Sequence, residues 1–262
     1  MTETLSLRAK IEQSPMGAYQ WMIVVMAAIM NLLDGFDVLA LAFTATAIRG
    51  EFGLTGIELG YLLSAGLFGM TAGSLFLAPL ADKIGRRPLL LMAVSLSAIG
   101  MLGSAFISQY QWLGFWRVIT GLGVGGILVG TNVITSEYSS RKWRSFAISV
   151  YAAGFGIGAV LGGMFAVMLQ GEYGWRSVFL AGAILTGLLL VVLFIWLPES
   201  IDFLTSKQPK NAEVRLNLIA FFIQKKLKNK MAGVLGFEPR DAEIKTRCLT
   251  AWRYPNYYLT AS

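Results

Sequence analysis

The chain has 262 residues, of which 55% are hydrophobic and only 14% are charged, and it carries a net charge of +7. The apolar residues form long blocks rather than the short alternating patterns of a soluble core, which indicates an all-α integral membrane protein. The single cysteine, Cys248, excludes a disulfide within the chain and a multi-cysteine metal site, and the absence of histidine excludes Ser-His-Asp and Cys-His catalytic arrangements. We therefore expect no enzyme activity, metal or cofactor.

Six apolar blocks are long enough to cross a bilayer as helices, which takes about 20 residues for about 30 Å of hydrocarbon. The sequence predicts a cytoplasmic N-terminal tail at 1–20, a six-helix membrane domain at 21–198, the start of a cytoplasmic central loop at 199–220, and an atypical tail at 221–262. The predicted spans are Trp21–Phe43, Leu59–Ala81, Pro88–Ser108, Leu113–Ser136, Ser145–Leu169 and Val178–Leu197.

Basic residues gather in alternate loops. The loop after the second span holds Lys83, Arg86 and Arg87, and the loop after the fourth holds Arg141, Lys142 and Arg144, whereas the intervening loops are poorer in basic residues. The positive-inside rule predicts a multi-pass protein of the inner membrane with both termini in the cytoplasm. Attraction to anionic lipid also accounts for the net charge, so no nucleic-acid partner is expected.

Two aspartates, Asp34 and Asp37, interrupt the first span. A carboxylate near the bilayer centre costs roughly 2.5 to 3.5 kcal/mol on insertion scales, so such residues usually face a bundle interior or a water-filled pathway. Because they are three residues apart on a helix, we expect them to point to nearly the same side. Without histidine, a carboxylate must carry any transported proton. The alternative is that one aspartate only supports packing through a hydrogen bond to a neighbour such as Asn31 or Thr44.

Arg117 lies near the start of the fourth span, about 7 Å into it by helical rise. Two interpretations remain open from its position. The side chain either extends outward to the interface with water, or faces a cavity where its guanidinium binds a substrate carboxylate or pairs with an aspartate of the first span.

The loop Leu80-Ala81-Asp82-Lys83-Ile84-Gly85-Arg86-Arg87 resembles the signature of the major facilitator superfamily, except that Ala78 replaces the usual leading glycine. The resemblance implies that Asp82, Lys83, Gly85, Arg86 and Arg87 form a cytoplasmic charge cluster that sets the balance between inward-open and outward-open states. Alternatively, the basic residues of this loop only determine topology.

Within that superfamily, Asp34-Gly35-Phe36-Asp37 resembles the paired-aspartate motif of the aromatic acid:proton symporter family. The resemblance implies proton-coupled import of an aromatic carboxylate such as benzoate or 4-hydroxybenzoate, with Asp34, Asp37 and Arg117 serving proton coupling and substrate binding. A superfamily transporter of another cargo, namely a sugar, a dicarboxylate or a drug, is the alternative.

No second set of spans follows the sixth, so the chain resembles the N-terminal six-helix half of such a transporter. The segment 221–262 suggests either a frameshift, insertion or early end, or a genuine cytoplasmic extension. Transport by rocking two halves around a midplane site needs a second half. We therefore expect the partners to be the lipid bilayer, protons, the aromatic substrate, and a second six-helix half or a homodimer; a non-transporting truncated fragment is the remaining possibility.

Overall fold

The computed structural model describes residues 16–207, 212, 215, 216 and 219, so the predicted tail at 221–262 lies outside the described residues. Six long helices, each apolar enough to cross a bilayer, occupy the described part and confirm the predicted all-α membrane fold. A short helix follows them. In chain order the elements are α2 (Ala18–Phe52), α3 (Gly56–Ile84), α4 (Arg86–Ala105), α5 (Tyr110–Tyr138), α6 (Arg144–Tyr173), α7 (Trp175–Trp196) and α8 (Ile201–Lys207).

Most of these helices extend past the predicted spans. Between α2 and α3, local capping and not the end of the apolar block sets the helix ends. The helix α2 ends at Gly53, whose backbone adopts a left-handed conformation with φ of 64°. The next helix begins at Thr55, where Thr55 and Glu58 cap each other reciprocally through side-chain bonds to backbone N–H groups.

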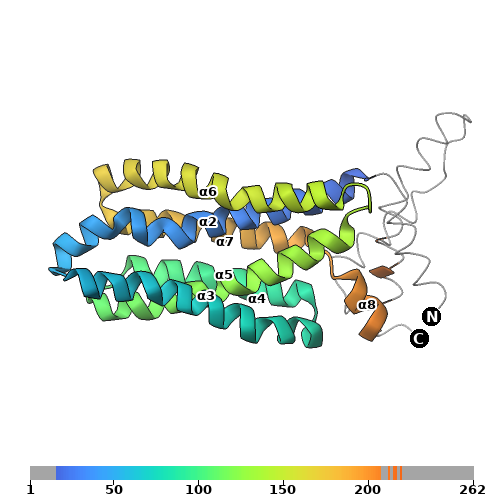
Figure 1. The fold of residues 1–262 in the computed structure, drawn as a ribbon, viewed down its shortest axis with the longest axis horizontal. Helices are drawn as coiled ribbons and strands as arrows, with labels where there is room; N and C mark the ends of the chain where they lie inside the picture. The colour runs from blue at the N-terminus through green and yellow to red at the C-terminus, as the bar shows by residue number, and fades with distance from the viewer. Residues whose placement is uncertain (1–15, 208–211, 213–214, 217–218, 220–262) are drawn as a thin grey trace, which may run out of the picture.

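The helices form two groups (Figure 1). One holds α2, α6 and α7 and the other holds α3, α4 and α5, with α2 packed mainly on α6 and α3 packed mainly on α5. Contacts of α4 with α7 and of α2 with α5 join the groups.

Glycines allow the close approach of these helices. On α6, Gly154 and Gly158 lie against the backbone of α2 at Ala28 and Leu32. Gly121 of α5 lies in the same way against the backbone of α3. Small residues at a spacing of four bring helices together in lipid, so these positions serve packing.

The helices differ in how much of their surface is covered. In the most apolar stretch of each helix, 61% of residues are buried in α2 and α5, against 17% in α3 and 28% in α6. The described part of the chain therefore has α2 and α5 at its centre. The helices α3 and α6 present broad apolar faces outward.

Polar contacts tie together the ends of the bundle. We call the end that carries the α3–α4 loop and α8 the basic end (Figure 1). At the opposite end, Arg176 binds Glu51 in a bidentate ion pair with distances of 2.7 and 2.9 Å, and the indole of Trp175 donates to the same carboxylate. This cluster joins the end of α2 to the start of α7.

Candidate functional site

Asp37 sits on α2 in the middle of the bundle, with only 1% of its surface exposed. The hydroxyl of Ser97 on α4 donates a 2.7 Å hydrogen bond to Asp37 Oδ2. The other carboxylate oxygen, Oδ1, has no hydrogen-bond partner among the described residues. On the α7 side, Gly182 packs closely here: a Cβ at that glycine would lie 3.4 Å from Oδ1 and would overlap Met101 Cε.

Arg117 on α5 is buried, with 3% of its surface exposed, so its side chain does not extend to the interface with water. Its Nη2 donates to Ser104 Oγ at 2.9 Å and Thr120 Oγ1 at 3.2 Å, and lies 3.0 Å from Met101 Sδ. Its Nη1 donates to the backbone carbonyl of Asp37 at 3.4 Å.

Two further features describe the Arg117 guanidinium. It lies over the ring of Phe179 on α7, with Cζ 4.7 Å from the ring centroid. Its Nε has no hydrogen-bond partner among the described residues. Nη1 and Nη2 thus hold the guanidinium in place, whereas Nε–H has no acceptor among the described residues.

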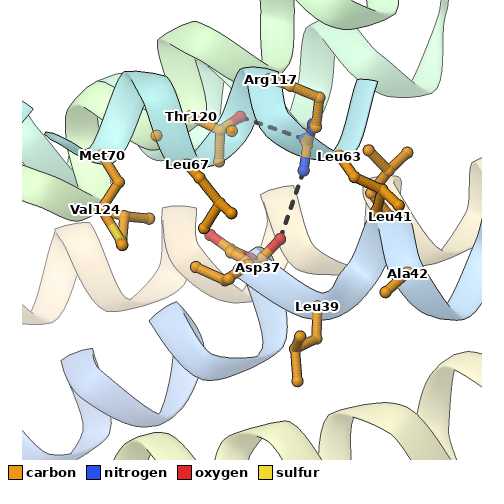
Figure 2. Close-up of a pocket in the computed structure, with 13 residues that line it drawn as sticks. Asp37, Leu39, Leu41, Ala42, Leu63, Leu67, Met70, Arg117, Thr120 and Val124 are labelled. Carbon is orange, nitrogen blue, oxygen red and sulfur yellow. Dashed lines mark hydrogen bonds between the residues drawn. The ribbon is translucent and has the colours of Figure 1, made fainter. Parts of the chain in front are cut away.

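Asp37 and Arg117 line the same cavity, of about 140 Å³, between α2, α3 and α5 (Figure 2). Thr120 is the third polar side chain in its lining. The remaining lining residues are apolar or glycine: Val38, Leu39, Leu41, Ala42, Leu63, Gly66, Leu67, Met70, Gly121 and Val124. An acceptor, a cation and a hydroxyl therefore meet in one largely apolar space, which is the usual composition of a small-molecule site.

Asp34 is also buried, with 2% of its surface exposed, but it does not line this cavity. The expectation that both aspartates point to nearly the same side therefore holds only loosely. A separation of three residues turns the side chain by about 60° around the axis, and in a packed bundle that angle changes the neighbours it meets. One carboxylate oxygen of Asp34, Oδ2, has no hydrogen-bond partner in the described part of the chain.

The two polar residues considered as packing partners of the aspartates bond elsewhere. Asn31 donates to the backbone carbonyl of Tyr151 on α6 at 2.8 Å. Thr44 donates to the carbonyl of Ala40 in its own helix at 2.8 Å. No group of three His, Cys, Asp or Glu residues that would suit a metal ion occurs among the residues that the structure describes.

The predicted charge cluster lies at the basic end. Asp82 forms a 2.8 Å ion pair with Arg86, whereas the backbone N–H of Arg87 donates to Glu199 Oε1 at 3.0 Å. Gly85 adopts a φ of 102°, and a Cβ there would come within 2.7 Å of Glu199 Oε2. Lys83 is exposed in the last turn of α3. The loop is thus bound to the segment after α7.

Similar proteins identify the family of this chain. Residues 27–250 match the family described as Major Facilitator Superfamily. The chain belongs to the major facilitator superfamily. It is 36% identical to the gallate transporter of Pseudomonas putida, over 78% of this chain and 45% of that protein. It is 34% identical to the 4-hydroxybenzoate transporter PcaK of the same species, over 82% of this chain and 48% of that protein.

A solved structure of the xylose transporter XylE from E. coli in a partially occluded inward-open conformation has the same fold. Its TM-score is 0.70 at 19% identity, over 91% of this chain and 60% of that chain. The chain spans about half the length of the curated relatives that it matches.

The sequence did not reveal several residues that complete these sites in this superfamily member. Ser97 and Ser104 lie seven residues apart on α4, a spacing of two helical turns, and that pair of hydroxyls in an apolar span was the available signal.

The basic end holds a second group of residues that the sequence did not reveal. Glu137 accepts from the hydroxyl of Ser200 and from the backbone N–H of Ile201, and the hydroxyl of Tyr138 donates to the carbonyl of Glu199 at 2.6 Å. These bonds join α5 to the α7–α8 connection across more than 60 residues of sequence, which no local pattern predicts.

Proposed function

We propose that this chain functions in the proton-coupled import of an aromatic carboxylate, of the benzoate or 4-hydroxybenzoate kind, across the inner membrane, with both termini in the cytoplasm. The observation that carries the proposal is that Arg117 and Asp37, each buried, line one cavity, while Arg117 Nε and Asp37 Oδ1 have no hydrogen-bond partner among the described residues. The names of the similar proteins from Pseudomonas putida support the class of substrate.

Arg117 is suited to hold the carboxylate group. A guanidinium binds a carboxylate through two parallel N–H bonds, and Nε–H is available for one of them. Ser104, Thr120 and Phe179 already fix the orientation of the group, so little side-chain freedom is lost when a ligand binds.

Asp37 is suited to couple binding to a proton. An ionised Asp37 would repel the substrate carboxylate, by about 4 kcal/mol for charges 4 Å apart at an effective dielectric of about 20. A protonated Asp37 removes this repulsion and offers a donor instead. Proton binding and anion binding therefore favour each other, and this is the linkage that a symporter requires. Asp34, one turn away and outside the cavity, is proposed as the second carboxylate of the proton path.

A second six-helix unit, either a second half or a second copy of this chain, is proposed to form the other wall of the pathway. The broad apolar faces of α3 and α6 support this, because such faces suit packing against another unit as well as against lipid. The cluster of Asp82, Lys83, Gly85, Arg86 and Arg87 is proposed to bias the access states, since it is bound to the segment that follows α7.

Uptake into right-side-out vesicles that contain the full chain tests the proposal. Labelled benzoate and 4-hydroxybenzoate are offered with an inward proton gradient, with the gradient collapsed by a protonophore, and in vesicles without the protein. We expect accumulation that disappears with the gradient. Accumulation that survives the protonophore would contradict proton coupling, and uptake of sugars or drugs but of neither acid would contradict the substrate class.

A further inference from the structure

The cavity around Arg117 and Asp37 has a distinct apolar side. In Figure 2, Leu67, Met70 and Val124 lie to one side of the line from Asp37 to Arg117. Leu67 and Met70 are three residues apart on α3, so they share a face of that helix, and Val124 of α5 completes the surface. We call these three residues the ring wall.

We infer that the ring wall is the subsite for the aromatic ring of the substrate, and that Gly66 beside it sets the size of ring admitted. The inference rests on the proposed function. If the carboxylate is held by Arg117, the rest of the molecule extends along a lining that is polar only at Asp37, Arg117 and Thr120.

The volume and chemistry of the cavity suit one ring. Its volume is about 140 Å³, and apolar cavities of about 150 Å³ lined by aliphatic side chains bind benzene. The thioether of Met70 adds a favourable sulfur–aromatic contact and adapts its shape through three rotatable bonds. The cavity as a whole therefore has about the volume needed for one benzene ring, and a fused two-ring acid is expected to fit less well.

Gly66 differs from Gly121 and Gly125, the glycines of α5 that pack against α3. A Cβ at Gly121 or Gly125 would meet the backbone of α3, so those glycines serve helix packing. A Cβ at Gly66 would meet nothing closer than the carbonyl oxygen of Arg117 at 4.0 Å. A methyl group there leaves the helices in place and takes up room in the cavity lining, which makes Gly66 a specificity-determining position.

The test is binding of labelled benzoate to the purified full chain in lipid nanodiscs, with 2-naphthoate as competitor. Wild-type protein is expected to prefer benzoate. Met70→Ala enlarges the space beside the ring wall and is expected to reduce that preference by about tenfold or more, because a methylene gained or lost in a hydrophobic pocket changes discrimination by about 10- to 200-fold. Gly66→Ala adds a methyl group to the lining and is expected to weaken benzoate binding by about tenfold for the same reason.

Gly60→Ala is the matched control, because Gly60 lies on the same helix, has no atom of the described residues within 4 Å of its Cβ position and does not line the cavity. It is expected to bind both acids as the wild type does. An unchanged ratio of the two affinities in Met70→Ala, or unchanged benzoate affinity in Gly66→Ala, overturns the ring subsite. Failure of the wild-type chain to bind benzoate at all overturns the proposed function instead.

Discussion

The guanidinium of Arg117 lies beside Asp37 but donates to its backbone carbonyl, at 3.4 Å, while the Asp37 carboxylate accepts from Ser97. Cation and carboxylate thus line one cavity without a direct ion pair between them in the part of the chain that the structure describes. A closed ion pair would leave neither group for a ligand, since a buried pair of this kind is strongly held. Because the Asp37 carboxylate and the Arg117 guanidinium bind different partners, both stay available to a ligand.

Replacement of Arg117 by lysine should weaken benzoate binding by about tenfold or more, because lysine keeps the charge but loses the bidentate geometry, and hydrogen bonds to charged groups contribute about 1.5 to 3 kcal/mol. Equilibrium binding of labelled benzoate measures this. Arg176→Lys makes the same change in a half-exposed ion pair at the far end of the bundle and should bind benzoate normally. Equal affinities of the two variants would argue against substrate contact by Arg117.

Asp37→Asn should abolish the pH dependence of benzoate affinity. In the wild type, affinity is expected to rise as pH falls, since a protonated Asp37 favours the bound anion. Asparagine still accepts from Ser97 but carries no titrating proton. Binding measured across the neutral pH range checks this, and the proton gradient should no longer drive uptake. Asp34→Asn, outside the cavity, should keep the wild-type pH dependence of binding. A pH dependence that persists in Asp37→Asn would exclude its coupling role.

Asp82→Asn should slow uptake without affecting insertion or thermal stability. The Asp82 side chain is 69% exposed and pairs with Arg86 one turn away, an interaction worth only about 0.3 to 0.5 kcal/mol. Benzoate affinity should stay normal because no residue of the cluster lines the cavity. Transport rate, binding and the thermal unfolding midpoint are measured on the same preparation. Normal uptake kinetics would leave topology as the role of this loop.

Gly158→Ala should lower the thermal unfolding midpoint, because its Cβ would overlap the backbone of α2 at Leu32 and force α2 and α6 apart. Overpacking of this kind costs typically 1 to 3 kcal/mol. Gly156→Ala is the paired control, since no atom in the described part of the chain lies within 4 Å of its Cβ position. Unfolding in detergent followed by fluorescence gives both midpoints. Equal midpoints would mean that α2 and α6 are less closely packed than the structure shows.

The features that could be predicted from the sequence depend on properties of single helical segments. Six helices follow from six apolar blocks, because every backbone polar group in lipid must be bonded within its own segment. The burial of Asp34 and Asp37 follows from the cost of placing a charge in hydrocarbon, whereas Arg117, near a span end, could also have reached the interface. Helix ends were less predictable: α2 continues to Phe52, because the glycine after it and not the apolar block stops the helix.

Hydropathy, charge and motifs were thus enough to predict the membrane fold, the family and the burial of Asp34 and Asp37, but they left Arg117 open between the interface and the cavity. The packed bundle was needed to show that Asp37 and not Asp34 lines the cavity, that Ser97 is its partner, and that Glu199 binds the Arg87 backbone from 112 residues away. The physical reason is that hydrophobic length and charge cost act within one helix, whereas a partner across the bundle depends on the rotation and packing of helices that are distant in sequence.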